Sequence, residues 1–580
     1  MTTLSPVGVV AGPIVVAALL LVCGRWLPRP VVDGVAILTT AAVGVSGAFL
    51  TPGAVTAGGW PAGVGIPLVV DGASRVLVTL VGTLATVALL FSWRYFSDVE
   101  AHFQGLVLLF VAGLGGFALS GDLFDMLVFF ELMGACGFAL AAYKIEEARS
   151  LQGGLTFGIV NSLGAYLTLC GIGLLYARTG TLGLAPLGAA HLPADTATVA
   201  AFVLVSTGWL VKAAVVPFHF WLADAHAVAP TPVCVLFSGV MAPLGVYGLA
   251  RVHAVVFGAL DVTVALTVLG LVTAVLGAVM CVLQRNVKRL LAYSTIAHIG
   301  TFVVAVAVSS PEASAGWLTD VVGHAGVKGA LFLLVGVLLA RHGSVDEIEL
   351  GGSCRRSRGI AALMALGGLA LAGLPPFGSA LGKGLIEQAV PVPVAVVLTL
   401  VAVLTGAAVL RVALRLVGIG PLPADRADDV RTTGEGEERE TRRLERLPVT
   451  MLAGPVLLLG GSLAVGLLTP GVLGAAGTAL VDGAGYRDLV LGGVPPTTPP
   501  AEVAWSASGL VVGTAAAVVA VLLALGAVYA GRLPTVLRRR VPRQNRAVLG
   551  LERLHSGHVG DYVAWVFVGI TALGALVLLG

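Results

Sequence analysis

Long apolar stretches, separated by short polar connections, fill almost the whole chain. A helix needs about 20 apolar residues to cross the hydrocarbon core of a bilayer, and sixteen stretches approach that length. We therefore predict an all-α polytopic membrane protein with about 14–16 transmembrane helices. The predicted spans are 7–26, 31–51, 73–93, 104–120, 123–143, 154–177, 198–217, 231–252, 258–283, 287–309, 317–341, 358–388, 391–417, 448–470, 507–531 and 560–579.

Two of these helices contain prolines that should interrupt them. Pro217 ends the seventh span, and Pro375 and Pro376 lie within the twelfth. Proline has no amide hydrogen, so it cannot continue the helical hydrogen bonding. One lysine lies close to each interruption, Lys212 in the seventh helix and Lys383 in the twelfth. An opened backbone and a charge are tolerated at membrane depth only in protein or beside water, which predicts a site where an ion meets the interior.

The positions of the two breaks also predict an internal repeat. The broken helices are five apart, an odd number, so corresponding helices run in opposite senses, as in inverted repeats. We expect two inverted five-helix repeats, formed by helices four to eight and nine to thirteen. The predicted segments are N-terminal helices at 1–99, the first repeat at 100–255, the second at 256–419, a charged linker at 420–447 and C-terminal helices at 448–580.

Composition agrees with a membrane location and excludes several classes of function. Of the 580 residues, 57% are hydrophobic and only 11% are charged, whereas soluble domains carry about 25% charged residues. The net charge of +3 is too small to suggest a nucleic-acid partner. The six cysteines lack metal-ligand spacing, and no glycine-rich phosphate motif lies between a strand and a helix. We therefore expect neither metal nor cofactor, and no active site belonging to this chain itself.

The distribution of lysine and arginine predicts the orientation. Connections after odd-numbered helices are rich in these residues, and those after even-numbered helices carry few. The positive-inside rule then places both termini on the outer side of the plasma (inner) membrane. We expect the first apolar run to be a retained helix. The basic segment 532–559 is equally consistent with an amphipathic surface helix and with a plain loop.

Further charged residues lie within the predicted spans. Glu131 is near the middle of the fifth helix, where a carboxylate costs about 2.5–3.5 kcal/mol, so we expect it to face the interior and pair with Lys212. His298 lies in the tenth helix. His324 and Lys328 are spaced i, i+4 in the eleventh, so they share one face. Glu387 follows Lys383 by one turn in the twelfth helix.

The motifs that carry these residues resemble a known family. KAAVVPFHFWLADAH followed by APTP, FFELMG, NVKRLLAYSTIAHIG, HAGVKGALF and GLPPFG with GK are together similar to the antiporter-like subunits of respiratory complex I, hydrogenase-4, formate hydrogenlyase and Mrp antiporters. The resemblance covers about residues 100–400. It implies two proton half-channels, joined at mid-membrane by a relay that runs through Glu131, Lys212, the His324–Lys328 pair and Lys383. Pro243 stands where many relatives have a lysine that bridges the two halves.

These observations lead to one functional prediction and two alternatives. The chain is expected to be a proton-translocating subunit of a complex I-like or hydrogenase-type respiratory complex, in which other membrane subunits supply the driving reaction. Any enzyme activity would then belong to the complex, such as an NADH-quinone oxidoreductase. The first alternative is a subunit of an Mrp-type Na⁺/H⁺ antiporter. The second is a structural subunit that conducts no ions, which Pro243 would favour.

Overall fold

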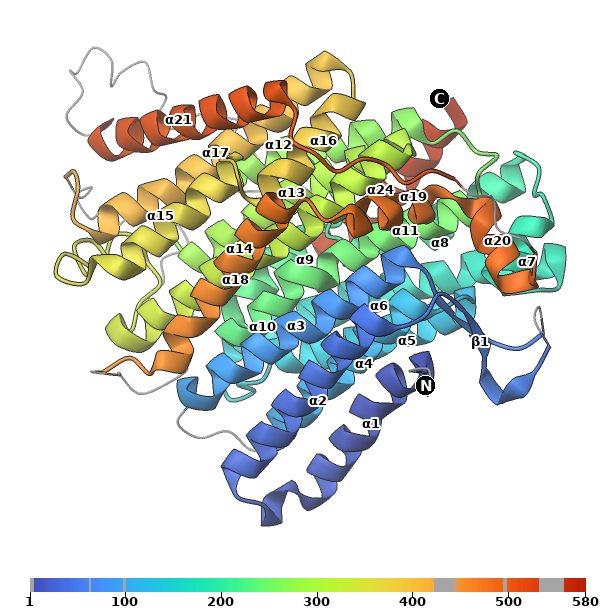
Figure 1. Ribbon diagram of the computed structural model, residues 1–580, viewed down its shortest axis with the longest axis horizontal. Coiled ribbons are helices and arrows are strands. Elements are labelled where there is room, and N and C mark those ends of the chain that lie inside the picture. The colour runs from blue at the N-terminus through green and yellow to red at the C-terminus, as the bar shows by residue number, and fades with distance from the viewer. Residues whose placement is uncertain are drawn as a thin grey trace.

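The computed structural model describes residues 5–61, 64–96, 101–421, 444, 446–493, 498–530 and 558–579. Its long helices lie side by side in one bundle, with α1 and α2 at one edge and α21 at the opposite edge (Figure 1). The predicted linker 420–447 and the basic segment 532–559 fall almost entirely outside the described residues.

The first half of the chain contains a small hairpin among its helices. Its elements are α1 (Pro6–Cys23), η1 (Gly24–Trp26), α2 (Arg29–Phe49), β1 (Gly53–Thr56), η2 (Ala57–Gly59), β2 (Pro67–Val70), α3 (Gly72–Tyr95), α4 (Ala101–Leu119), α5 (Leu123–Ala141), α6 (Ala148–Thr179), α7 (Leu184–Ala189), α8 (Thr196–Lys212), α9 (Phe220–Val228), α10 (Thr231–Leu236), η3 (Phe237–Met241) and α11 (Ala242–Val256).

The second half is entirely helical within the described residues. Its elements are α12 (Thr263–Leu283), α13 (Val287–Val308), α14 (Pro311–His342), α15 (Arg358–Ala372), α16 (Gly378–Ala389), α17 (Val392–Leu416), α18 (Val449–Leu468), α19 (Gly471–Val481), α20 (Gly483–Leu491), α21 (Ala507–Tyr529) and α24 (Val559–Leu579).

The predicted fold class is confirmed. Among the described residues, fourteen helices are long and apolar enough to cross a membrane, and each matches one predicted span. The two remaining predicted spans are the broken helices: α8 continues as α9, and α15 continues as α16. The short elements β1, β2, α7, α19 and α20 were not predicted, because none of them reaches the length of an apolar span.

The first break leaves few backbone groups without partners. Helix α8 ends at Lys212, five residues before Pro217. The carbonyl group of Val211 accepts a hydrogen bond from the indole of Trp221 at 2.9 Å. The amide of Val216 donates to the hydroxyl of Thr273 at 3.0 Å. Side chains therefore replace the helical partners that the break removes, as an interrupted helix at membrane depth requires.

The second break depends on a glycine. Gly373 caps α15 with φ of +102°, a backbone conformation that side chains rarely adopt. A Cβ atom at this position would also lie 3.1 Å from Cε of Lys383. The glycine therefore allows both the sharp turn before Pro375 and the close approach of the lysine side chain.

Helix α14 lies at the centre of the second half and is almost completely enclosed. It meets α16 backbone to backbone: a Cβ atom on Gly382 would lie 2.1 Å from the amide nitrogen of Asp320, and one on Gly323 would lie 2.1 Å from that of Ser379. Small residues permit such close packing of membrane helices. The same contact brings polar residues of α14 and α16 together.

Candidate functional site

Lys212 occupies the end of α8, and its side chain is fully buried. Its Nζ lies 4.1 Å from the ring centre of Phe130 and 5.6 Å from that of Phe157. Gly134 on α5 leaves space for it, since a Cβ atom there would lie 3.2 Å from Nζ. Among the described residues, this ammonium group has no hydrogen-bond partner. Two aromatic faces therefore provide its immediate contacts, a cation–π environment.

The expectation that Glu131 faces the interior was wrong. Its side chain is exposed, on the same face of α5 as the exposed Phe124, Val128 and Phe138. The inward face of this helix carries Phe130 and Gly134 instead. No ion pair joins Glu131 to Lys212 among the described residues, although the two charges affect each other electrostatically. An apolar helix in lipid has no hydrophobic pattern that would reveal this rotation.

Lys328 and His324 lie on one face of α14, as their spacing predicted, and both are buried. The ammonium group of Lys328 donates hydrogen bonds to the carbonyl of Leu291 and to the hydroxyl of Ser294, both on α13. The ring of His324 lies 4.5 Å from the ring of His298 between centroids. The structure therefore brings the two predicted histidines together.

Lys383 and Glu387 form an ion pair one turn beyond the second break. The Nζ of Lys383 lies 2.8 Å from Oε1 of Glu387, and the hydroxyl of Thr399 donates to the same oxygen at 2.5 Å. Lys383 is 4% exposed. This pair lies within the second half, on the helix that packs against His324 and its neighbours on α14.

Two buried polar residues were missed in the sequence. His226 on α9 is fully buried, and neither of its ring nitrogens has a hydrogen-bond partner among the described residues. Its ring stacks on Phe332 at 4.7 Å and lies 5.9 Å from Phe237. Phe237 in turn contacts Phe157, the ring beside Lys212. His226 thus lies between the Lys212 site and Lys328, whose charge acts on it.

The second missed residue is Asp320, four residues before His324 on α14. Its side chain is 1% exposed. The same i, i+4 spacing that singled out His324 and Lys328 could have identified it. Together with His298 and His324 it forms the one group of three or more potential metal ligands found among the described residues, with donor atoms within 4.8 Å of one another.

Pro243, which breaks the family pattern, lies in the first turn of α11 directly after the π-helical turn η3. The chain from Thr231 to Val256 nevertheless forms one continuous, completely enclosed span. The absence of a lysine at this position therefore does not disrupt the helix, and His226 from α9 supplies a polar group in the region between the two halves.

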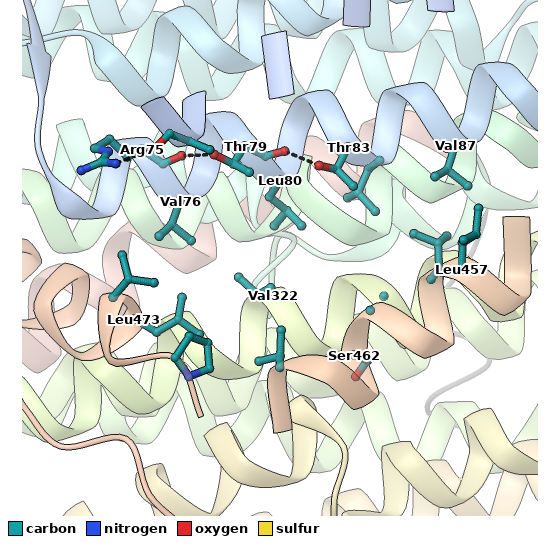
Figure 2. A pocket seen from close by; sticks show the side chains of 18 of the residues that line it. Arg75, Val76, Thr79, Leu80, Thr83, Val87, Val322, Leu457, Ser462 and Leu473 are labelled. Carbon is teal, nitrogen blue, oxygen red and sulfur yellow. Dashed lines mark hydrogen bonds between the residues drawn. The ribbon is translucent and has the colours of Figure 1, made fainter. Parts of the chain in front are cut away.

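A separate groove of about 660 Å³ lies between α3, α14, α18 and α19. Figure 2 shows its lining, in which Arg75, Thr79 and Thr83 follow one another along α3 opposite apolar side chains such as Leu457 and Leu473. Arg75 donates to the carbonyl of Ala48 at 2.6 Å. None of the predicted relay residues lines this groove, so it is not part of the candidate site.

Comparison with known proteins gives consistent matches. A family profile described as NADH:quinone oxidoreductase/Mrp antiporter, TM, matches residues 120–409. NADH-quinone oxidoreductase subunit N of Desulforudis audaxviator is 32% identical over 82% of this chain and 97% of its own length. A probable K⁺/H⁺ antiporter protein of Rhizobium meliloti, itself one subunit of an antiporter, is 31% identical over 60% of this chain and 69% of its own. A chain in the structure of the Mrp complex from Dietzia sp. DQ12-45-1b superposes with a TM-score of 0.72, at 25% identity, over 83% of this chain and 98% of that chain.

Proposed function

Because the chain belongs to the NADH:quinone oxidoreductase/Mrp antiporter transmembrane family, we propose that it is a proton-translocating subunit of a complex I-like or hydrogenase-type respiratory complex. Its relatives are membrane subunits of multi-subunit complexes. The observation that carries the proposal is the series of buried cationic side chains Lys212, Lys328 and Lys383, two of which lie beside interrupted helices. Buried charges at membrane depth are costly and typically mark an ion pathway.

The proposed relay begins at Lys212 and ends at Lys383. Lys212 has no hydrogen-bonding partner among the described residues, so its protonation responds strongly to any charge brought near it. His226 would carry the proton past Phe157 and Phe237 to Lys328, taking the role of the lysine that Pro243 replaces. From Lys328 the proton would pass to the pair of His298 and His324, then to Lys383 and Glu387. The two helix breaks would open the half-channels.

Glu131 acquires a different role in this proposal. An exposed carboxylate in the middle of a membrane helix is unfavourable in lipid by about 2.5–3.5 kcal/mol. A neighbouring membrane subunit would therefore cover this face of α5 and offer a cationic or hydrogen-bonding group to Glu131. Movement of that partner would change the field at Lys212, because the two charges interact through the protein.

The remaining expectations about organisation are retained as part of the proposal. The two inverted repeats are placed at 100–255 and 256–419, followed by the linker at 420–447 and the C-terminal helices. The chain would lie in the plasma membrane with both termini on the outer side, as the distribution of lysine and arginine indicates. Protons would be the transported ion, and electron transfer would occur in partner subunits.

The relay is tested by Lys212→Met, which keeps the length of the side chain and removes its charge. Vesicles that contain the whole complex should show at least about a tenfold loss of proton transport, since a positioned acid–base group contributes 10²–10⁴-fold. Lys144→Met, in the connection after α5, is the matched control and should transport normally. Normal transport by an assembled Lys212→Met complex would rule out the relay.

A second candidate is a subunit of a Na⁺/H⁺ or K⁺/H⁺ antiporter, supported by the similarity to the Rhizobium protein and by the Dietzia Mrp structure. The Desulforudis oxidoreductase protein matches a larger share of this chain than the Rhizobium antiporter protein, which favours the respiratory complex. Proton efflux from vesicles that requires added Na⁺ or K⁺, and no electron donor, would support the antiporter instead.

A further inference from the structure

Three buried polar side chains converge inside the second half. His298 comes from α13, and Asp320 and His324 come from α14; each is at most 4% exposed. Their donor atoms lie within 4.8 Å of one another. Among the described residues, neither oxygen of Asp320 nor either ring nitrogen of His324 has a hydrogen-bond partner. A buried polar group without a partner costs about 1–3 kcal/mol, and more when it is charged, so this arrangement needs a reason.

The packing of α14 against α16 holds Asp320 beside the exit of the proposed relay. The backbones touch where Gly382 meets Asp320, one residue before Lys383. The charged and titratable groups that act on Asp320 or on its histidine neighbours are Lys383 and Glu387 from α16 and Lys328 from α14 itself. Asp320 is thus a carboxylate set among cations and imidazoles, between the histidine pair and the second helix break.

We propose that Asp320, together with His298 and His324, forms a proton-binding site through which protons pass from the histidine pair to Lys383. The inference rests on the proposed function, because it adds a carrier to that relay. A protonated imidazole would give its N–H proton to a carboxylate oxygen of Asp320. The resulting carboxylic acid would give the same proton to the neutral amine of Lys383. Asp320 thereby returns to its ionised form, and one positive charge has moved along the membrane protein.

The geometry suits a proton better than a metal ion. Zinc binds imidazole and carboxylate ligands at about 2.0–2.2 Å, which in a tetrahedron requires ligand atoms only ~3.3 Å apart. Two hydrogen bonds of about 2.8 Å through one water molecule span ~4.6 Å, close to the separation that the three side chains allow. Lys328 and Lys383 would in addition repel a divalent cation.

The test compares Asp320→Asn with Lys383→Met, and with Thr319→Val as the matched control. Thr319 precedes Asp320 on α14, and its hydroxyl donates to the carbonyl of Ala315 in its own helix. Proton transport is measured in vesicles that contain the whole complex. We expect a loss of at least about tenfold for Asp320→Asn and for Lys383→Met, and normal transport for Thr319→Val.

The outcomes separate this inference from the function on which it rests. Loss of transport in Lys383→Met with normal transport in Asp320→Asn would refute the role of Asp320 and leave the relay intact. Normal transport in both variants would refute the relay itself. If Asp320→Asn does not assemble, Asp320→Glu keeps a carboxylate: transport by the assembled complex supports the inference, and its loss overturns it. Stoichiometric metal in the purified complex that disappears in Asp320→Asn would also overturn it.

Discussion

Replacing Glu347 with glutamine should destabilise the second half strongly. Glu347 follows α14 and is fully buried. Its Oε1 lies 2.8 Å from Nε of Arg411 and 2.8 Å from an Nη of Arg415, and its Oε2 accepts from Arg411 at 2.9 Å. Arg411 also donates to two carbonyls at the end of α12, those of Val282 and Gln284. One carboxylate therefore ties α17 to the connection after α14 and, through Arg411, to α12.

The magnitude follows from what the substitution leaves behind. Glutamine has nearly the same shape, but its amide turns N–H donors towards guanidinium groups that are only 11% exposed. Removing one partner of a buried ion pair costs about 3–5 kcal/mol. The two carbonyl bonds of Arg411 remain, so we expect the lower end, about 3 kcal/mol. That amounts to roughly a 100-fold shift in the unfolding equilibrium.

The assay is unfolding of the purified protein in mixed micelles, followed by tryptophan fluorescence. Glu349→Gln is the matched control, because this exposed residue lies two positions away and its contact with the Ser344 hydroxyl can be kept by an amide oxygen. Its change should remain within about 0.5 kcal/mol. If Glu347→Gln unfolds like Glu349→Gln, the buried carboxylate does not hold the helices together and the reasoning fails.

Two further substitutions test other contacts. Arg178 donates hydrogen bonds of 2.7 and 2.8 Å to Asp195, which hold the pKa of this carboxyl well below its usual value. The stabilisation is therefore present above the unfolded pKa of about 3.9 and lost as the pH falls through the folded value. Asp195→Asn keeps the helix cap, so it should lower the melting temperature at pH 7 and lose this effect in acid; an equal difference at every pH would contradict the assignment. Gly382→Ala should weaken assembly, because its Cβ would meet the backbone of Asp320, whereas Gly384→Ala, whose Cβ would approach Cα of Gly509 only to 3.9 Å, should assemble normally; equal assembly would show that α14 and α16 do not pack this closely.

Much of the fold could be predicted because its signals are local. Each span is marked by a continuous apolar run, and Pro217 and Pro375 locate the two breaks from covalent structure alone. The spacing of His324 and Lys328 places them on one face of α14 without any tertiary information. Short elements such as α19 and α20 were missed, since a segment too short to cross the membrane has no comparable signal.

The candidate site was only partly predictable. Lys212, Lys328 and Lys383 stand out because a charge within an apolar run is unusual. His226 and Asp320 did not, because one lies beside the first break and the other near the start of a long helix, where polar residues are ordinary. Their importance comes from burial without hydrogen-bond partners among the described residues, and that depends on which helices surround them.

The sequence by itself determined that this is a polytopic helical membrane protein, where its helices run, and which of them are interrupted. Only the tertiary structure decided that Glu131 faces outward and that His298, Asp320 and His324 meet. The physical reason is that lipid and protein interior are equally apolar. An apolar helix therefore carries little information about its own rotation, and contacts such as those of Gly382 and Gly134 fix which side chains point inward.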